Sequence, residues 1–377
     1  MKIDILQFLP ENTKIKILDS NFSKEIFSTK RVSDFSNLFD VPLKNMSRYK
    51  IGNRGIPLNI FLKLINIAKF NISRMQEKIA IKIGKTGKYI KIGPEIEIDS
   101  DWIYVSELIK GDGHIPKNYH NIVFVNNNCT LIEHVRNFFL KQGLDKSRMG
   151  ITKRSDADFL IIYSMLFAQI FNKIFGIPVG KKGEIPINDF VIKNEKFSKA
   201  AVRGAFDAEG SIGIYGSRRI TISSNSKLWL GKLKDILDNL KIKSRIILDK
   251  SKENKSIYRM IIYNIINIKR FYRLIKPIHS ERVKKFKEII NNANFTPKGL
   301  FPKKVLKCIN EGKIKRVDLA EELNRKMCLI GNDLRLLKRK NLIEARGTYT
   351  NKGSFYEYNL TESGRHYLKN NLDSFLD

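Results

Sequence analysis

Cysteine is nearly absent from this chain of 377 residues, which carries only Cys129, Cys308 and Cys328. Three cysteines are too few for a disulfide framework, and their spacing matches no metal-binding motif. The expected compartment is therefore a reducing cytoplasm, which we assign to a prokaryote and, within that group, to an archaeon.

Long apolar runs are also missing. No stretch of 18 or more apolar residues occurs, so we expect no membrane-spanning helix and no membrane partner. The N-terminus, Met1-Lys2-Ile3-Asp4, has no basic region followed by an apolar run, so we expect no secretory signal.

Acidic residues are outnumbered. The chain has 38 Asp and Glu against 70 Lys and Arg, which gives a formal charge of +32. The basic residues are spread through every segment and are not gathered in one amphipathic helix, so nucleic acid is favoured over a membrane surface as the partner. Abundant Lys, Ile and Asn are also typical of an AT-rich genome, and a generically basic protein remains the alternative.

The middle of the chain is duplicated. Lys146-Ser147-Arg148 recurs as Lys243-Ser244-Arg245, and the same offset of 97 carries Asp112-Gly113 onto Glu209-Gly210. After a short insertion the match continues at an offset of 100, where Ile161-Ile162-Tyr163 becomes Ile261-Ile262-Tyr263. A duplicated unit with one acid in each copy predicts a pseudo-twofold body whose two carboxylates meet near the axis.

The pattern inside each copy predicts the order αββαββα, and hence an α+β fold. A helix, at 102–112 and again at 197–208, ends in acid-Gly, and two strands, a long helix, two more strands and closing helices follow. In the second copy a Gly216-Ser217 turn separates the first strand pair. The predicted domains are 1–98, 99–196, 197–298 and 299–377.

The two ends of the chain predict separate domains. Residues 32–38 and 43–49, separated by a turn at Pro42, have the pattern of a helix-turn-helix in which Arg48 would contact DNA, although a non-binding helical domain needs similar spacing. Residues 78–98 predict a strand hairpin. In the tail, three helices and two strands follow the order of a winged helix. Some winged helices bind DNA, and others serve only as contacts to another protein. Its expected phosphate contacts are Arg335, Lys338, Arg339, Arg346 and Lys352.

The two acid-bearing helices carry small residues that permit close packing: Ser106, Gly111, Gly204, Ala205 and Ala208. Such packing would bring Asp112 and Glu209 together at the helix ends. Two nearby carboxylates repel each other unless a cation lies between them, and Mg²⁺ bridging them could hold and polarise a scissile phosphate. The alternative for Asp112 alone is a helix-end acid before a glycine cap.

These two helices resemble the LAGLIDADG motifs of homing endonucleases over residues 100–290, about half of the chain. The resemblance implies that Asp112 and Glu209 are catalytic metal ligands, with Gly111 and Ala208 beside them at a Mg²⁺ site that Mn²⁺ could also fill. It further implies two saddle-shaped sheets lying along the DNA major groove, with both strands cut to leave staggered ends.

One residue departs from the family pattern. Glu107 stands where the second copy has Gly204, and a buried unpaired carboxylate would be costly. We expect either a basic partner such as Arg203 or a rotation that brings Glu107 to water.

Basic residues around the sheets are candidate phosphate and groove contacts. Lys153 and Lys250 each follow their acid by 41 positions and are expected to stabilise phosphate charge, although a solvated strand-end lysine is the alternative and Lys252 competes with Lys250. The other candidates for DNA contact on or beside the strands are Lys117, Tyr119, Arg154, Tyr215, Arg218, Arg219, Lys252 and Arg259.

The sequence therefore predicts a free-standing, monomeric, metal-dependent endonuclease for double-stranded DNA. It does not have the terminal His-Asn pair of an intein. Two alternatives stay open: a DNA-binding regulator that keeps the fold without cleavage, and an RNA maturase that acts in intron splicing.

Overall fold

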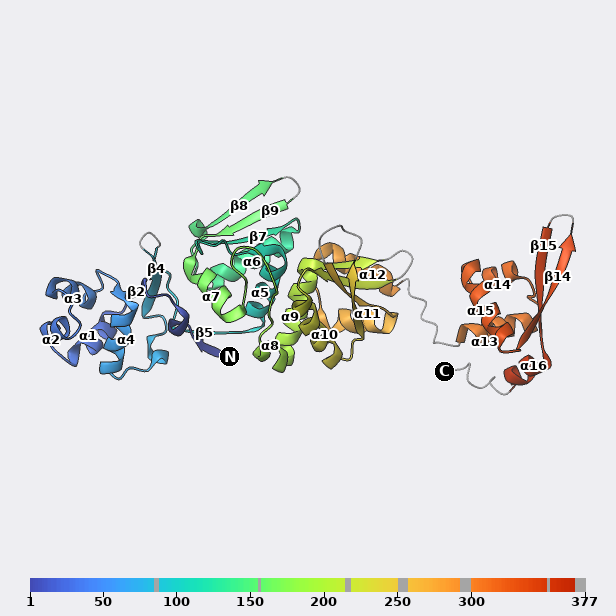
Figure 1. The fold of residues 1–377 in the computed structure, drawn as a ribbon, viewed down its shortest axis with the longest axis horizontal. Helices are drawn as coiled ribbons and strands as arrows, with labels where there is room; N and C mark the ends of the chain where they lie inside the picture. The colour runs from blue at the N-terminus through green and yellow to red at the C-terminus, as the bar shows by residue number, and fades with distance from the viewer. Residues whose placement is uncertain are drawn as a thin grey trace. The chain divides into compact units, whose positions relative to one another are not determined.

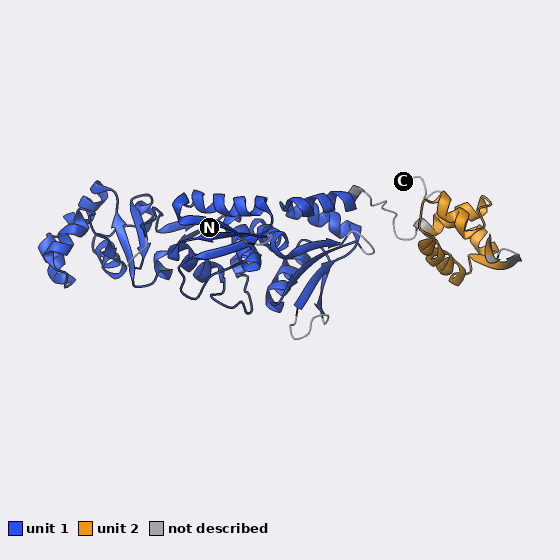
Figure 2. Cartoon of the chain, turned by 90° about the horizontal axis from the view of Figure 1, so that it is seen from above, with its two compact units in different colours: residues 1–293 blue, residues 294–377 orange. Residues whose placement is uncertain are grey.

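The computed structural model describes residues 1–84, 88–154, 157–213, 218–249, 257–291, 300–350 and 353–369. The chain forms two compact units, residues 1–293 and residues 294–377 (Figure 2). None of the described helices is long and apolar enough to cross a membrane.

The N-terminal part of the first unit combines helices with a small sheet (Figure 1). The helices are α1 (Ser20–Ser28), α2 (Val32–Leu38), α3 (Leu43–Lys50) and α4 (Leu58–Ile67), and the sheet has the order β3 (Ile56–Pro57), β2 (Thr13–Ile17), β4 (Ile79–Ile83). Helices α2 and α3 lie where the sequence predicts a helix pair, and Phe35 is fully buried between them and α1. Arg48 is exposed on α3.

The hairpin expected at 78–98 is wrong in its pairing. Strand β4 pairs with β2, while β5 (Glu95–Glu97) pairs with the N-terminal strand β1 (Lys2–Asp4). Between the two halves of the expected hairpin the structure has a bridge at Ile81 and Ile90. The alternating isoleucines do form a strand, but its partner lies more than 60 positions earlier, which local sequence does not reveal.

The two copies of the duplicated core have the predicted element order. The first contains α5 (Ser100–Asp112), β6 (Gly113–His114), β7 (Ile122–Asn126), α6 (Cys129–Lys141), β8 (Met149–Arg154), β9 (Ala157–Ile162) and α7 (Met165–Phe175). The second contains α9 (Glu195–Glu209), β10 (Gly210–Gly213), β11 (Arg219–Ser224), α10 (Lys227–Asn239), β12 (Ser244–Asp249), β13 (Ile257–Ile262), α11 (Ile265–Ile275) and α12 (Ser280–Asn291), and a short helix, α8 (Asp189–Lys193), links the copies. Both antiparallel sheets have the same order, β6-β7-β9-β8 and β10-β11-β13-β12.

The edge strands are not aligned as the repeated sequence suggests. Met149 pairs with Ile162 in the first sheet, whereas Ser244 pairs with Ile262 in the second. Because β9 and β13 correspond at an offset of 100, β8 and β12 correspond at an offset of 95. The repeated Lys-Ser-Arg triplets, which are 97 positions apart, are therefore displaced by two residues in the two ladders.

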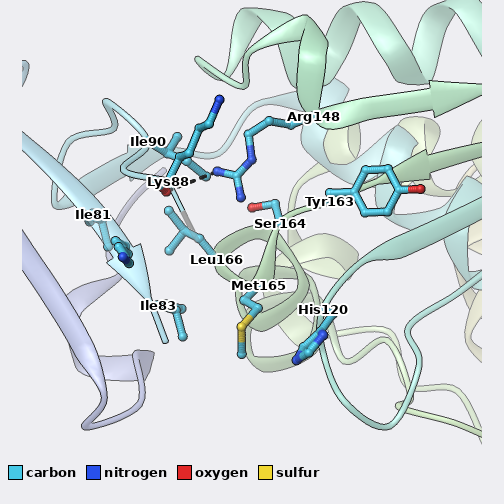
Figure 3. Close-up of a pocket in the computed structure, with 11 residues that line it drawn as sticks. Ile81, Ile83, Lys88, Ile90, His120, Arg148, Tyr163, Ser164, Met165 and Leu166 are labelled. Carbon is cyan, nitrogen blue, oxygen red and sulfur yellow. Dashed lines mark hydrogen bonds between the residues drawn. The ribbon is translucent and has the colours of Figure 1, made fainter. Parts of the chain in front are cut away.

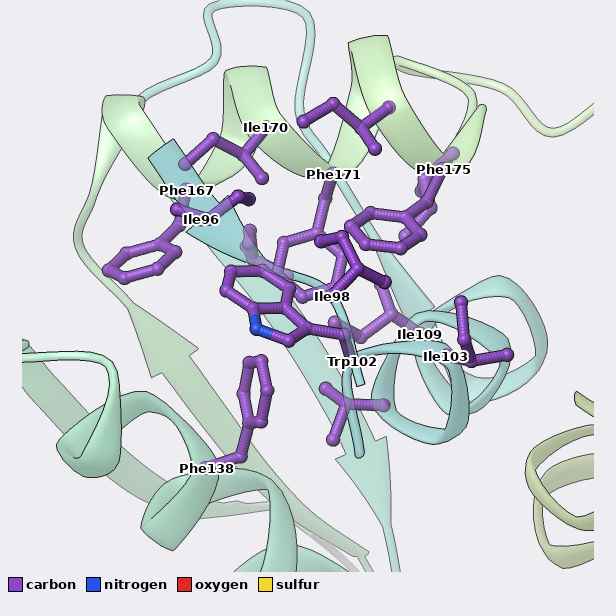
Figure 4. Close-up of a cluster of buried hydrophobic side chains, with 14 of the residues drawn as sticks. Ile96, Ile98, Trp102, Ile103, Ile109, Phe138, Phe167, Ile170, Phe171 and Phe175 are labelled. Carbon is purple, nitrogen blue, oxygen red and sulfur yellow. The ribbon is translucent and has the colours of Figure 1, made fainter. Parts of the chain in front are cut away.

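The first copy is built around Trp102. Asp99 begins α5 by accepting hydrogen bonds from the backbone N–H groups of Asp101 and Trp102, at 2.8 and 3.1 Å. The indole then lies among aromatic side chains of α6 and α7 (Figure 4), with Phe138 edge-on at 4.8 Å and Phe175 stacked at 5.7 Å between ring centroids. This core fixes α5 against the sheet.

The second unit has its own core and the element order expected of a winged helix. Its elements are α13 (Leu300–Asn310), α14 (Arg316–Glu322), α15 (Met327–Arg339), the paired strands β14 (Ile343–Thr350) and β15 (Gly353–Leu360), and a final helix α16 (Glu362–Lys369) that the sequence did not predict. Arg335, Lys338, Arg339 and Arg346 are exposed, and Lys352 lies outside the described residues. DNA binding by this unit stays a prediction.

Candidate active site

Helices α5 and α9 pack against each other through glycine. A Cβ atom on Gly204 would lie 2.5 Å from the carbonyl oxygen of Tyr104, and one on Gly111 would lie 2.4 Å from Cβ of Ala208. Both positions therefore exclude any side chain. The small residues noted in the sequence permit this close approach, and as a result the two helices end side by side.

Each helix ends at its acid, and the two acids interact. Asp112 accepts a hydrogen bond from Nδ2 of Asn126 at 2.7 Å. Burial raises the pKa of Asp112, and burial together with the nearby charge of Asp112 raises the pKa of Glu209. Glu209 lines a pocket of about 260 Å³ with Gly111 and Ser223. The structure thus brings the two predicted acids into one half-buried site.

Two cations that the sequence reading missed stand at these helix ends. Lys182 donates to the carbonyl oxygen of Lys110, at 2.8 Å, and to that of Gly111. Arg282 donates to the carbonyl oxygens at the end of α9: Phe206 at 2.6 Å, Asp207, and Ala208 at 2.9 Å. Both cations oppose the rise in the pKa of Glu209. Lys182 and Arg282 stand 100 positions apart, which is the offset of the later part of the repeat. This offset is the feature of the sequence that could have identified them as an equivalent pair.

Burial also acts on the two cations themselves. It lowers the pKa of Lys182, and the charges of Glu209 and Asp112 oppose that effect. It lowers the pKa of Arg282 in the same way, with Asp207, Asp112 and Glu209 in opposition. Each acid is therefore near a cation that is itself partly removed from water, which strengthens the interaction between them.

Glu107 has a basic partner, as the first expectation requires, but that partner is Lys110 and not Arg203. Its carboxylate accepts from Nζ of Lys110 at 2.6 Å and from Nε1 of Trp229 at 2.7 Å, and all three side chains are buried. Lys110 also donates to the carbonyl oxygen of Pro186 at 2.9 Å. Arg203 instead donates to the carbonyl oxygen of Ile275. The cost of burying Glu107 is met by a lysine one turn later and by an indole from the other copy.

A second buried acid ties the two copies together. Asp207 accepts a hydrogen bond from the hydroxyl of Tyr104 at 3.0 Å and others from the backbone N–H groups of Ile278 and His279. His279 is in turn 3.3 Å from Nδ2 of Asn128. Burial, together with the charge of Arg282, lowers the pKa of His279 to about 4. This network holds the segment before Arg282 against the first copy.

The donor atoms at the helix ends suit a hard divalent cation. Two carboxylates and the neighbouring carbonyl oxygens are the oxygen ligands that Mg²⁺ and Mn²⁺ prefer. The carbonyls of Gly111 and Ala208 already accept from Lys182 and Arg282, but a carbonyl oxygen has a second lone pair. Among the described residues no group of three or more His, Cys, Asp and Glu side chains could hold a metal ion. At the helix ends, Asp112 and Glu209 would be the side-chain ligands of such an ion.

The expected equivalence of Lys153 and Lys250 is wrong. Lys153 pairs with Asp158 in the first sheet, and the corresponding position in the second, which pairs with Tyr258, is Leu248. The sequence offset fails here because the edge strands are displaced. Lys250 and Lys252 lie outside the described residues, as does Tyr215. A phosphate-stabilising role for these lysines stays a prediction.

The other predicted contacts lie in varied surroundings. The hydroxyl of Tyr119 donates a hydrogen bond to Oδ1 of Asn172 at 3.1 Å, so this hydroxyl already has a partner within the protein. Arg259 forms an ion pair with Asp249 at 2.6 Å. Lys117, Arg218 and Arg219 are exposed, and Arg154 ends β8.

A further pocket, of about 220 Å³, lies beside β4 (Figure 3). It is lined by Ile81, Lys88, Arg148 and Tyr163 among others, and Arg148 donates to the carbonyl oxygen of Lys88 at 3.2 Å. Neither acid lines it, so it is separate from the site at the helix ends.

Comparison with known proteins identifies the second copy. Residues 196–276 match the family model of the LAGLIDADG-like domain. The sequence matches none of the curated proteins with which it was compared. Among solved structures, variants of the homing endonuclease I-DmoI are 19% identical over 48% of this chain and 97% of theirs, with a TM-score of 0.37. Full-length DUF199/WhiA from Thermatoga maritima is 15% identical over 65% of this chain and 93% of its own, with a TM-score of 0.36.

Proposed function

We propose that this protein, which carries a LAGLIDADG-like domain at residues 196–276, is an endonuclease that cuts double-stranded DNA at a specific site with a divalent metal. The observation that supports it is the meeting of Asp112 and Glu209 at the ends of two glycine-packed helices. Burial raises the pKa of both carboxyls, and a basic side chain stands beside each helix end. Two acids in this setting favour a metal ion that neutralises them.

The acids would hold the metal ion, with the carbonyls of Gly111 and Ala208 beside them. A divalent ion there, Mg²⁺ or Mn²⁺, would polarise a phosphodiester and stabilise its leaving oxygen. Asn126 orients Asp112 through its hydrogen bond, which leaves the other carboxylate oxygen to face the ligand. Lys182 and Arg282 fix the helix ends and add positive charge where a phosphate would lie.

The rest of the molecule supplies a basic surface for a polyanion. The chain has a formal charge of +32, and exposed basic residues occur in both units, among them Arg48 on α3, Arg219 on β11 and Lys338 on α15. We propose that the four predicted domains act together, with the two end domains lengthening the DNA contact.

One observation favours a second function, a DNA-binding regulator that does not cut. Lys182 and Arg282 carry two positive charges beside the two negative charges of Asp112 and Glu209, so the site is balanced without a metal ion. If these cations occupy the place of the metal, the fold would bind DNA and leave it intact.

A cleavage assay distinguishes the two functions. The protein would be incubated with a fragment library of genomic DNA and Mg²⁺ or Mn²⁺, and new ends would be mapped. We expect double-strand ends at one site, lost in Glu209→Gln and in Asp112→Asn, while both variants still bind that site. Their metal-free affinity should rise, because an amide does not repel phosphate. Equal cutting by wild type and both variants would exclude these acids as catalysts.

The salt dependence of DNA binding completes this test. Binding should weaken with salt at a log-log slope of about −9 if roughly ten phosphates are contacted. A slope near zero would remove DNA as the main partner. Steep salt dependence without any cutting in either metal would instead establish the regulator.

A further inference from the structure

The two sheets present chemically different open faces. In each sheet, alternate residues of the third strand point toward the helices, as buried Leu160 and Met260 do. Their neighbours Phe159 and Arg259 therefore point to the opposite side, which we call the open face. Phe159 and Arg259 occupy equivalent positions in the two sheets. Phe159 pairs with Val125 and Arg259 pairs with Ser223, and these two partners stand at the same position from the end of β7 and β11. An aromatic ring in one copy thus stands where the other has a guanidinium.

The same contrast holds at three more equivalent positions of the open faces. The pairs, first copy then second, are Val123 and Thr221, Val125 and Ser223, and Gly150 and Arg245. Five positions do not follow it: Ile161 and Ile261 are alike, Ala157 and Ile257 are both apolar, His114 and Ser211 are both polar, Thr152 corresponds to Ile247, and Arg154 corresponds to Asp249. The first open face is predominantly apolar, and the second is polar and rich in arginine.

The arginines of the second open face are held in place. Nη2 of Arg259 is 2.6 Å from Oδ2 of Asp249. The guanidinium of Arg245 lies over the ring of Tyr263, 4.6 Å from its centroid, and Nε donates to the tyrosine hydroxyl at 3.0 Å. A guanidinium fixed by a carboxylate or a ring loses less freedom when it binds a planar partner in bidentate fashion.

This face is continuous with the acid site. Arg219, Arg259 and Ser223 line one hollow of about 240 Å³, and Ser223 also lines the pocket that contains Glu209. A ligand with its phosphate at the acids would therefore extend directly over these arginines.

On its two middle strands, β7 and β9, the first open face carries apolar side chains, and its arginine position, Arg154, is at the end of the edge strand β8. Val125, Phe159 and Ile161 are half-buried, so part of each apolar side chain faces the surroundings. Apolar side chains cannot bond base edges, but they can contact the methyl group of thymine, whereas arginine pairs in bidentate fashion with the O6 and N7 atoms of guanine.

We propose, on the basis of the proposed function, that the DNA target is asymmetric in composition. The half that lies over the second sheet has guanines facing Arg245 and Arg259. The half that lies over the first sheet is rich in A·T pairs, whose thymine methyl groups contact Val125 and Phe159. The two copies would thus read different sequences with one backbone framework.

Selection from a randomised DNA duplex tests this with the full chain, in chelator so that no cleavage occurs. The enriched sequences should carry guanines at two or more positions on one side of the centre and A·T pairs on the other. Arg259→Gln should weaken binding to the selected site by about 10-fold or more and change the preference at one position of the guanine half from guanine toward adenine. Phe159→Arg should create a guanine preference in the A·T half.

The control is Arg136→Gln on α6, whose arginine pairs with Glu133 and lies off the open face. It should leave the selected sequence unchanged. Two halves of equal composition, or unchanged preferences in both Arg259→Gln and Phe159→Arg, would overturn the inference while DNA binding stands. If wild type enriches no sequence and binds no duplex, the proposed function fails as well. Should Arg259→Gln not fold, judged by circular dichroism, Arg245→Gln replaces it.

Discussion

Lys182 and Arg282 stand 100 positions apart and do the same thing: each donates hydrogen bonds to the last carbonyl oxygens of the acid-bearing helix of its own copy. The C-terminal end of a helix carries partial negative charge, and each of these ends also carries a carboxylate. A cation at each end offsets both. The pair therefore lets two acids meet inside the protein before any ligand arrives.

Removing either cation should impair cutting. Lys182→Met and Arg282→Met are expected to lower the cleavage rate by about 100-fold or more, because each loses a fixed positive charge near the phosphate. Lys182→Arg and Arg282→Lys keep the charge and should retain more activity than the methionine variants. Single-turnover cleavage at saturating protein measures this. Lys173→Met, which removes an exposed lysine of α7, is the control; an equal loss there, or none in the first two, would contradict the role.

The acids should destabilise the metal-free protein at neutral pH. Folding raises the pKa of Asp112 and Glu209 above their ordinary values of 3.8 and 4.5, so ionisation favours the unfolded chain. Asp112→Asn and Glu209→Gln should therefore raise the melting temperature in chelator, by about 2–4 °C for each kcal/mol of relief. This gain in melting temperature should be complete at pH values above the folded-state pKa of each carboxyl. It should vanish as the pH falls below the ordinary pKa values of the two carboxyls.

Thermal melts at several pH values check this. Glu288→Gln, on an exposed position of α12, is the control and should show no comparable gain. A destabilising effect of both active-site amides at pH 7 would show that the carboxylates are stabilised by their cations more than they are penalised by burial.

The helix interface should not tolerate a methyl group at Gly204. A Cβ atom there would meet the backbone of α5 at 2.5 Å, so Gly204→Ala must separate the helices and should cost about 1–3 kcal/mol of the free energy of unfolding. Gly231 in α10 is a matched control, since a Cβ there meets nothing within 4 Å. Gly231→Ala should stabilise by about 0.5–1 kcal/mol. Urea unfolding that shows the same effect for both variants would refute this account of α5 and α9.

The buried pair of Glu107 and Lys110 should be costly to break and cheaper to replace. Glu107→Ala leaves the ammonium of Lys110 and the indole N–H of Trp229 without their partner, and we expect a loss of about 3–5 kcal/mol. The double variant Glu107→Leu with Lys110→Met removes both charges and should lose much less. Denaturant unfolding compares the two. A double variant as unstable as the single one would mean that the pair itself contributes the stability.

The C-terminal unit should affect binding and not chemistry. A chain that ends at residue 293 keeps both acids and the whole first unit. We expect weaker or less selective DNA binding, with metal-dependent cutting still visible at high protein concentration. Cutting lost from a folded truncation, as judged by circular dichroism, would show that the second unit completes the active site.

Local patterns in the sequence determined much of this structure. The element order αββαββα follows from hydrophobic periodicity, and the duplication is legible as repeated residues at fixed offsets. The glycines at positions 111 and 204 predicted that two helices pack closely, and therefore that Asp112 and Glu209 lie near each other. Each of these inferences depends on residues within a few turns of one another, or on a repeat that copies such a pattern.

Only the tertiary structure decided which distant residues complete the site. Lys182 and Arg282 each stand more than 65 positions after the carbonyls they bind, and Trp229 reaches Glu107 from the other copy, 122 positions away. The register of β8 and β12 likewise departs from the repeated triplets by two residues. Strand register and long-range partners are set by which side chains fill a shared core once the chain has closed on itself, and that competition has no local signature.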